Sequence, residues 1–218
     1  MIKAVLFDLD GTFADTAPDL ADALNKVRLE NDLPALPLED VRLETSNGAH
    51  ALIKLGFDLD ENDPDFIPLK EKLLENYSNN IAQYTTLFDG MEDLLQKLDQ
   101  QNIAWGIVTN KPERFTNPLM KELGITPRTN CIVSGDTTAH SKPHPESLIY
   151  AAKLLNLEPF ECLYIGDAER DIQAARNAGM PSLVAMFGYL GSDDHPQEWG
   201  ADGVINHPVE AISYLSES

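Results

Sequence analysis

The chain of 218 residues contains few cysteines and few basic residues. Its two cysteines, Cys131 and Cys162, lie in apolar stretches and form no CxxC pair, so we expect two reduced, buried thiols. Sixteen Lys and Arg residues against thirty-six Asp and Glu residues give a net charge of −20. This charge repels DNA, RNA and anionic lipid. We therefore expect neither a nucleic acid nor a membrane as a partner.

Long apolar runs and internal repeats are also missing. No stretch approaches the roughly 18 apolar residues that a membrane span requires. The first apolar run, residues 4–7, is too short for the apolar region of a signal peptide and stops at Asp8. We therefore expect a cytoplasmic protein. The length suffices for a sizeable core, in one domain or in two small ones.

Residues 1–14 and 87–218 alternate short apolar runs with amphipathic segments. The runs lack an alternation of apolar and polar residues, which is typical of strands covered on both faces. They lie at residues 2–7, 103–109, 131–134, 162–166 and 182–187. Between them, the periodicity predicts helices at 89–101, 118–123, 145–156 and 168–178. Asp89 and Glu92 suggest a cap for the first of these helices, and Pro118 suggests that the second begins only there.

This alternation predicts an α/β fold, a Rossmann-like parallel sheet with helices on both faces. Residues 15–86 have no strand-like run and form an inserted all-helical domain in this prediction. Thr16 and Asp19 match a capping box at its start, and helical patterns follow near 47–56 and 65–82. The predicted domains are therefore 1–14 with 87–218, and 15–86.

The stretch AVLFDLDGT places two aspartates at the end of the first predicted strand. Residues two apart on an extended chain point the same way, so Asp8 and Asp10 present their carboxylates on one side. By itself a DxD pair is more typical of two solvated loop acids. In open parallel sheets, however, ligands bind at the carboxyl ends of the strands.

The other predicted strands end in polar groups that can reach the same place. Thr109 and Asn110 end the second strand, Lys142 follows the third, and Asp167 follows the fourth, with Asp171 one helical turn later. Carboxylates clustered in this way repel one another unless a cation lies among them. Oxygen ligands of this kind suit Mg²⁺. A metal ion together with Lys142 would supply the positive charge that binds a phosphate group.

The spacing suggests a phosphoryl-transfer chemistry. Asp8 can attack phosphorus and form an aspartyl-phosphate, and Asp10 can protonate the leaving alkoxide and then activate a water molecule. Gly11 allows the backbone to approach the phosphoryl group closely. The predicted phosphate-binding residues are Gly11, Thr12, Thr109, Asn110 and Lys142.

The segments DLDGT, VTN, SKPHP and GDAERD resemble, in this order, the four motifs of the haloacid dehalogenase-like hydrolase superfamily. The resemblance covers the whole chain. It implies a Rossmann-like core and a helical cap domain of the C1 type inserted after the first motif. It also implies a Mg²⁺ site of Asp8, Asp10 through its carbonyl, Asp167 and Asp171, with Asp171 supporting either the metal's waters or Lys142. Asp10 favours a phosphatase, because the dehalogenase branch lacks an acid there.

Within the superfamily the chain resembles the phosphoglycolate phosphatase group, which would act in carbohydrate metabolism. Residues 108–125 and 188–202 also resemble a close relative, N-acetylmuramic acid 6-phosphate phosphatase of peptidoglycan recycling. Phe13 stands where leucine is commoner in the first motif. A small phosphorylated metabolite is the expected partner, and the sequence leaves monomer and homodimer open.

The predicted cap contains the candidates for substrate specificity. Residues 44–50, ETSNGAH, form a possible substrate loop, in which Gly48 permits close approach and Ser46 and Asn47 can hydrogen-bond or simply start a helix. Arg42 and Lys54 flank this loop and could meet a substrate carboxylate.

Two other functions fit parts of the pattern. A capped sugar phosphomutase would use the same scaffold but return the phosphoryl group to a sugar. A phospho-accepting signalling receiver also places acids, a threonine and a lysine at strand ends, but the helical insertion and GDAERD disfavour it. The five histidines are scattered and show no HExxH motif, so the sequence assigns them no metal-binding role.

Overall fold

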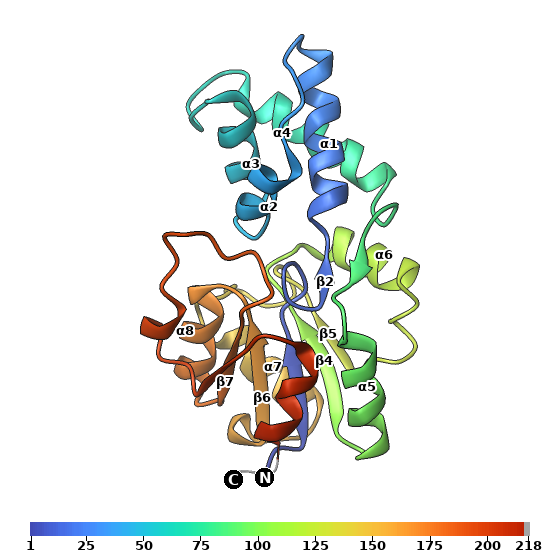
Figure 1. Ribbon diagram of the computed structural model, residues 1–218, viewed down its shortest axis with the longest axis vertical. Helices are drawn as coiled ribbons and strands as arrows, with labels where there is room; N and C mark the ends of the chain where they lie inside the picture. The colour runs from blue at the N-terminus through green and yellow to red at the C-terminus, as the bar shows by residue number, and fades with distance from the viewer. Residues whose placement is uncertain (216–218) are drawn as a thin grey trace. The chain divides into compact units, whose positions relative to one another are not determined.

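The computed structural model describes residues 1–215, and the chain divides into two compact units (Figure 1). The first comprises residues 1–14 and 87–215 of the described chain, and the second comprises residues 15–86. Within residues 1–215, no helix combines the length and the apolar character that crossing a membrane would require.

The first unit is built on a six-stranded sheet in the order β5-β4-β1-β6-β7-β8. Every pairing in it is parallel. The strands are β1 (Ala4–Phe7), β4 (Ala104–Val108), β5 (Cys131–Val133), β6 (Cys162–Gly166), β7 (Ser182–Ala185) and β8 (Gly203–Ile205). The five predicted strands are confirmed, and β8 is an edge strand that the apolar pattern did not reveal.

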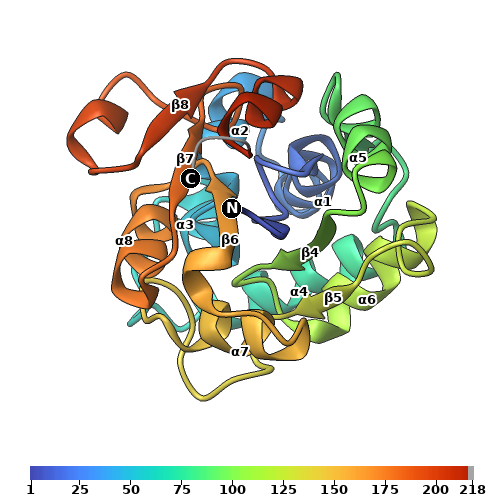
Figure 2. The same cartoon turned by 90° about the horizontal axis from the view of Figure 1, so that it is seen from below.

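Helices cover both faces of this sheet, as the alternation of apolar runs and helical patterns predicts (Figure 2). Helices α7 (Glu146–Leu154) and α8 (Glu169–Ala178) pack against each other on one face. Helix α5 (Met91–Gln100) and the 3₁₀ segment η3 (Pro208–Tyr214) pack together on the other. Strands β1, β6 and β7 are buried along their whole length, which explains their continuous apolar runs. The other elements of this unit are α6 (Glu113–Glu122), η1 (Pro159–Glu161) and η2 (Pro196–Glu198).

Two local predictions in this unit are wrong. Helix α6 begins at Glu113 and runs through Pro118, because Phe115, Leu119 and Met120 bury one face of it. This tertiary packing outweighs the hydrogen bond that proline removes. Helix α5 has no side-chain cap, and Gly90, in a left-handed conformation, precedes it instead of a capping Asp89.

The second unit is all-helical, as predicted, and has four helices. These are α1 (Ala17–Glu30), α2 (Leu38–Thr45), α3 (Gly48–Phe57) and α4 (Phe66–Asn79). Helix α1 packs against each of the other three. Helix α2 was not predicted from the sequence. Strands β2 (Ala14–Asp15) and β3 (Thr86–Leu87) form a two-stranded sheet where the chain crosses between the units.

The capping box predicted at the start of α1 is not formed. Thr16 makes no side-chain cap, and Asp19 is engaged elsewhere. Its carboxylate accepts hydrogen bonds from the backbone of Tyr84 and from both the backbone and the hydroxyl of Thr85. Asp19 therefore joins the first helix of this unit to the segment that leaves it.

Candidate active site

The site lies at the carboxyl ends of β1 and β6, which are neighbours in the sheet. The chain leaves β1 towards β4, by way of α5 on one face, and leaves β6 towards β7, by way of α8 on the other face. Adjacent strands whose connections run in opposite directions open a crevice between their ends. Asp8 follows β1 and Asp167 follows β6, so both occupy this crevice.

Three carboxylates converge there. Oxygens of Asp8, Asp167 and Asp171 all lie within 4.8 Å of one another, and all three residues are buried. Asp171 belongs to the first turn of α8, where it accepts a hydrogen bond from the backbone of Ala168 at 3.0 Å. The structure thus brings together the acids of the first and fourth motifs, 163 positions apart between Asp8 and Asp171 (171 − 8).

Lys142 supplies the positive charge beside these acids. Its ammonium lies 2.9 Å from Asp8 Oδ1 and 2.6 Å from Asp171 Oδ1, and its side chain is almost completely buried. It also donates hydrogen bonds to the Tyr164 hydroxyl at 2.7 Å and to the Val108 carbonyl at 3.1 Å. Burial alone would lower the pKa of Lys142, but the carboxylates of Asp171 and Asp8 raise it above its usual value, so the lysine is charged.

Asp167 shows that the site holds an excess of negative charge. Burial, and then repulsion by Asp8 and Asp171, raise the pKa of Asp167 to about 7. Hydrogen bonds from the Tyr189 backbone at 2.9 Å and from the Thr12 hydroxyl at 3.0 Å oppose this shift only in part. With all three carboxylates ionised, one lysine would leave two uncompensated negative charges, which a divalent cation would neutralise. The oxygen donor set therefore fits Mg²⁺.

Asp10 is separate from this carboxylate group. Its Oδ1 lies 2.9 Å from Lys111 Nζ, and both side chains are largely buried. Among residues 1–215, its carboxylate is not part of the group of three acids that could hold a metal ion. Asp10 lies in the turn after β1, which also contains Gly11 and Thr12.

Gly11 is required by the geometry of this turn. Its φ angle is +85°, which L-residues with a side chain rarely adopt, and a Cβ atom there would lie 2.2 Å from Asp167 Oδ2. The absence of a side chain therefore lets the turn approach Asp167.

The remaining predicted phosphate-binding residues have identifiable partners. The buried Thr109 hydroxyl accepts a hydrogen bond from the Lys111 backbone at 3.2 Å. The Asn110 side chain donates to the Lys142 carbonyl and accepts from the Lys142 backbone N–H, both at 2.9 Å. Asn110 therefore links the end of β4 to the loop that contains Lys142.

Sequence reasoning missed Lys111 and Tyr164. Lys111 directly follows the predicted Thr109-Asn110 pair, and this position just after a strand could have identified it as a candidate site residue. Tyr164 provides the one phenol in an otherwise apolar strand, CLYIG. Its hydroxyl donates to the Val108 carbonyl at 2.8 Å, and burial raises its pKa well above the usual value, so it stays neutral beside Lys142.

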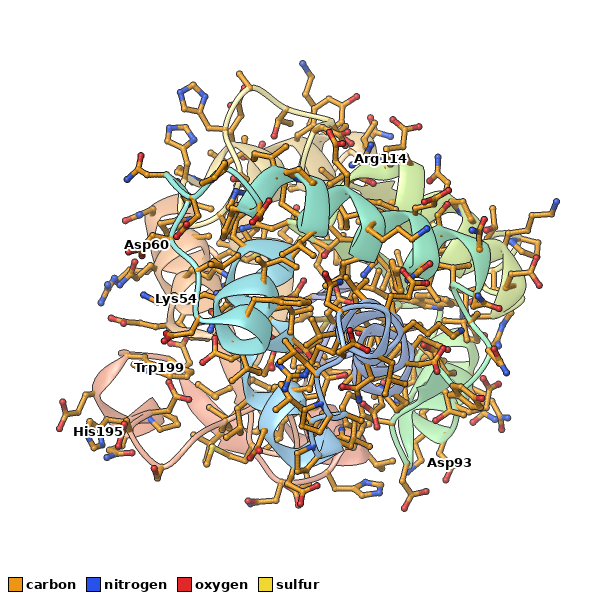
Figure 3. All side chains as sticks on the ribbon, turned by 90° about the horizontal axis from the view of Figure 1, so that it is seen from above. Lys54, Asp60, Asp93, Arg114, His195 and Trp199 are labelled. Atoms are coloured by element: carbon orange, nitrogen blue, oxygen red, sulfur yellow. The ribbon has the colours of Figure 1, made fainter. Side chains whose placement is uncertain are left out.

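The predicted specificity residues all lie in the second unit, and the structure separates them into two places. Ser46 and Asn47 connect α2 to α3, Gly48 begins α3 with a φ of +80°, and Arg42 forms an ion pair with Asp15 at 2.7 Å. Lys54 lies further along α3, in the lining of a 470 Å³ cavity that also includes Asp60 (Figure 3).

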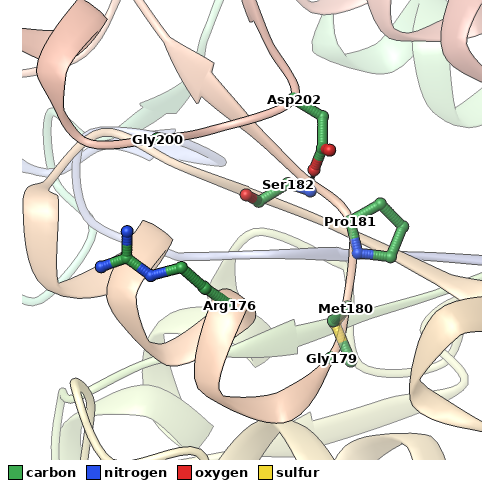
Figure 4. Close-up of a pocket in the computed structure, with 7 residues that line it drawn as sticks. All are labelled: Arg176, Gly179, Met180, Pro181, Ser182, Gly200 and Asp202. Atoms are coloured by element: carbon green, nitrogen blue, oxygen red, sulfur yellow. Dashed lines mark hydrogen bonds between the residues drawn. The ribbon is translucent and has the colours of Figure 1, made fainter.

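A second cavity, of 340 Å³, lies in the first unit, at the amino-terminal end of β7. It is lined by residues around the amino end of β7, including Arg176, Ser182 and Asp202 (Figure 4). The Asp202 carboxylate accepts a hydrogen bond from the Ser182 backbone at 2.8 Å. This cavity is therefore remote from the carboxyl ends of the strands, where the acids gather.

Residues 5–185 match the family model described as haloacid dehalogenase-like hydrolase. The chain belongs to this family. The matched residues include all four motifs and the inserted helical unit. The resemblance seen in the sequence is therefore confirmed, as is the predicted fold class.

Similar proteins narrow the enzyme class. An N-acetylmuramic acid 6-phosphate phosphatase from Pseudomonas putida is 41% identical over 209 residues, covering 96% of this chain and 94% of the relative. A phosphoglycolate phosphatase from Xanthomonas campestris pv. campestris is 42% identical over 209 residues, covering 95% and 94%. The crystal structure of a predicted phosphoglycolate phosphatase from Haemophilus somnus 129PT superimposes with a TM-score of 0.86 at 26% identity, covering 99% of this chain and 98% of that one. These similarities confirm the predicted class, a phosphatase of this family.

Proposed function

We propose that this hydrolase is a Mg²⁺-dependent phosphatase that removes the phosphoryl group from a small phosphomonoester by way of an aspartyl-phosphate on Asp8. One observation carries the proposal: the buried carboxylates of Asp8, Asp167 and Asp171 converge at the carboxyl ends of parallel strands, and the ammonium of Lys142 lies against two of them, Asp8 and Asp171. A site with excess negative charge attracts a divalent cation, and the cation and the lysine together attract a phosphate dianion.

The residues that would hold Mg²⁺ are Asp8, Asp167 and Asp171, directly or through water, together with the backbone carbonyl of Asp10. When bound, the ion would supply positive charge towards the phosphoryl oxygens. Lys142, the Thr109 hydroxyl and the backbone N–H of Asp10 would bind the same oxygens. The backbone N–H groups of Gly11 and Thr12 donate to the carbonyls of Ala14 and Leu9 at 3.2 and 3.5 Å and would have to exchange these hydrogen bonds to join them. Asn110 would position Lys142 through the two hydrogen bonds to its backbone.

The reaction would proceed in two displacements at phosphorus. An Asp8 carboxylate oxygen attacks phosphorus, the bond from phosphorus to the ester oxygen breaks, and Asp10 donates a proton to the departing alkoxide. Asp10 then takes a proton from a water molecule that attacks the aspartyl-phosphate. The bond between Asp8 and phosphorus breaks, inorganic phosphate leaves, and both aspartates regain their initial states.

Phosphoglycolate is the first candidate substrate, and N-acetylmuramic acid 6-phosphate is the second. Relatives with these two activities match the chain with nearly equal identity, 42% and 41%. Both substrates combine a phosphomonoester with a carboxylate, so the position of the group that donates to that carboxylate decides between them. The candidate residues for this role are Arg42, Ser46, Asn47, Gly48 and Lys54 of the helical unit, which we propose acts as a cap domain.

We further propose a cytoplasmic enzyme of carbohydrate metabolism, working as a monomer or a homodimer. The two cysteines are free and buried, and burial raises the pKa of Cys131 to about 12 and that of Cys162 to about 11. Thiols in this state suit a reducing compartment.

The decisive test of the mechanism is Asp8→Asn, with hydrolysis of a phosphomonoester panel measured in Mg²⁺. Loss of the nucleophile should lower kcat by roughly 10⁴-fold or more. Asp93→Asn, at an exposed acid of α5, is the control and should retain full turnover (Figure 3). An Asp8→Asn enzyme that still hydrolyses the panel with Mg²⁺ would exclude the aspartyl-phosphate route.

The substrate is tested by comparing kcat/KM for phosphoglycolate and N-acetylmuramic acid 6-phosphate in one assay. A preference for phosphoglycolate supports the first candidate, and the reverse preference supports the second. Phosphate release without isomerisation of a sugar phosphate would exclude a phosphomutase.

A further inference from the structure

His140 and His144, four residues apart in the sequence, lie side by side on the loop between β5 and α7. The rings of His140 and His144 lie with their centroids 4.4 Å apart, tilted by 32°. Glu146, the first residue of α7, lies beside them. One ligand atom from each of these three residues lies within 4.8 Å of the other two. None of the three belongs to the carboxylate group at the active site.

We propose that His140, His144 and Glu146 form a second metal site, which binds a transition-metal ion of the Zn²⁺ class and is distinct from the Mg²⁺ site. Two imidazoles and one carboxylate are ligands that Zn²⁺, Ni²⁺ and Cu²⁺ prefer, whereas Mg²⁺ prefers oxygen ligands alone. Three protein ligands leave a fourth position of a tetrahedral ion to water.

The separations of the three groups suit such an ion. His140 Nδ1 and Glu146 Oε2 lie 3.1 Å apart. With metal–ligand bonds of about 2.0–2.1 Å, this separation corresponds to an angle of roughly 100° at the metal, close to a tetrahedral angle. Two ligands of one ion can be at most about 4.2 Å apart. The ligand atom of His144 therefore needs only a small rotation of an exposed side chain to complete the site.

The surrounding backbone already holds the ligands in place. Glu146 Oε2 also accepts a hydrogen bond from the His140 backbone N–H at 3.0 Å. The Glu146 backbone N–H donates to His144 Nδ1 at 3.3 Å, and His144 would give up this long hydrogen bond when it binds the ion. Pro143 and Pro145 restrict φ within the same short segment. Little conformational entropy would therefore be lost when an ion binds, and binding would release any proton that the ligating nitrogens carry.

This site would act on the loop that holds Lys142. Lys142 lies between His140 and His144 in the chain, and its ammonium reaches Asp8 and Asp171. An ion bound by residues 140, 144 and 146 closes that segment into a ring and restricts its motion. The backbone amides of residues 140–146 should therefore exchange with solvent more slowly when the ion is bound.

The test uses the full chain without an affinity tag, stripped of metals and then kept in saturating MgCl₂. Titration with ZnCl₂ in a calorimeter should give one bound Zn²⁺ per chain. The double variant with His140→Ala and His144→Ala should lose roughly tenfold or more in Zn²⁺ affinity, and Glu146→Gln should lose affinity while keeping the fold. His195→Ala, at an exposed histidine elsewhere in this unit, is the matched control and should bind as the wild type does (Figure 3).

Hydrogen exchange in the same samples locates the ion. Zn²⁺ should slow exchange in residues 140–146 of the wild type and leave the double variant unchanged. The proposal is overturned if no saturable Zn²⁺ site exists in the presence of Mg²⁺, or if the site persists in the double variant. Neither readout depends on turnover, so the result is independent of the proposed phosphatase activity.

Discussion

Lys111 Nζ lies 2.9 Å from Asp10 Oδ1 in a largely buried ion pair at the carboxyl ends of β4 and β1. Asp10 is the proposed proton donor and acceptor. An acid/base group must be held within hydrogen-bond reach of the oxygen that it serves. Lys111 can donate the same hydrogen bond to Asp10 Oδ1 whether Asp10 is protonated or ionised, so it fixes the direction of the carboxyl group and is a positioning residue in the proposed mechanism.

Replacing Lys111 by methionine should therefore slow the chemistry without unfolding the protein. Methionine keeps much of the side-chain volume but cannot pair with Asp10, and we expect kcat to fall by roughly 10- to 100-fold. Steady-state kinetics with a phosphomonoester would measure this loss. Lys153→Met, at an exposed position of α7, is the control. An unchanged kcat in Lys111→Met would show that Asp10 needs no such support.

The stability of the metal-free protein should fall as the pH rises from about 4 to about 7. The pKa of Asp167 is raised to about 7 in the folded protein, against about 3.9 in an unfolded chain. Its contribution to stability is therefore complete below pH 4 and is lost as the pH rises through 7, because the unfolded chain ionises first. Urea unfolding in EDTA across this range measures the effect, and Asp167→Asn should reduce the slope.

Adding Mg²⁺ should reverse this loss most strongly at high pH. An ionised Asp167 binds the cation better than a protonated one, and a ligand that binds only the folded state stabilises it. The increase in Tm on adding Mg²⁺ should therefore be larger at pH 8 than at pH 5.5. An equal increase at both pH values would argue against Asp167 as a ligand.

Gly11→Ala should destabilise the protein more than a matched change at Gly124. Both glycines have positive φ angles, +85° and +70°, so both alanines are strained by about 1–2 kcal/mol. Only at Gly11 does the new Cβ meet other atoms, 2.2 Å from Asp167 Oδ2, while nothing lies within 4 Å at Gly124. Comparing the urea midpoints of the two variants isolates the contact. If their midpoints agree, the approach of the turn to Asp167 has no energetic consequence.

Asp19→Asn should destabilise the helical unit. The buried Asp19 carboxylate accepts hydrogen bonds from the backbones of Tyr84 and Thr85 and from the Thr85 hydroxyl, at distances from 2.6 to 3.1 Å. An asparagine amide group would turn a donor towards these donors, at a cost of about 1–3 kcal/mol. Thermal unfolding measures the change. Asp22→Asn on the same helix breaks only a surface ion pair with Lys26 and should have a much smaller effect.

The sequence by itself determined the class of fold and the main acids of the candidate site. Five strands of the parallel sheet were readable because a strand covered on both faces must be apolar throughout. The sequence also predicted that Asp8, Lys142 and Asp167 lie close together. The carboxyl ends of parallel strands meet at one edge of the sheet, so residues that follow different strands can be expected to be neighbours. The helical insertion could be predicted because the apolar periodicity of a helix depends only on residues that are close together in the sequence.

Only the tertiary structure decided the partners of individual side chains. Asp19 matched a capping box by spacing, yet it binds Thr85 across 66 positions, because buried donors there need an acceptor. The pairing of Lys111 with Asp10 and the meeting of His140 with His144 depend on how loops fold over the sheet edge, which no periodicity encodes. Local patterns fix the elements, whereas the direction of each side chain depends on packing and hydrogen bonds between segments far apart in the chain.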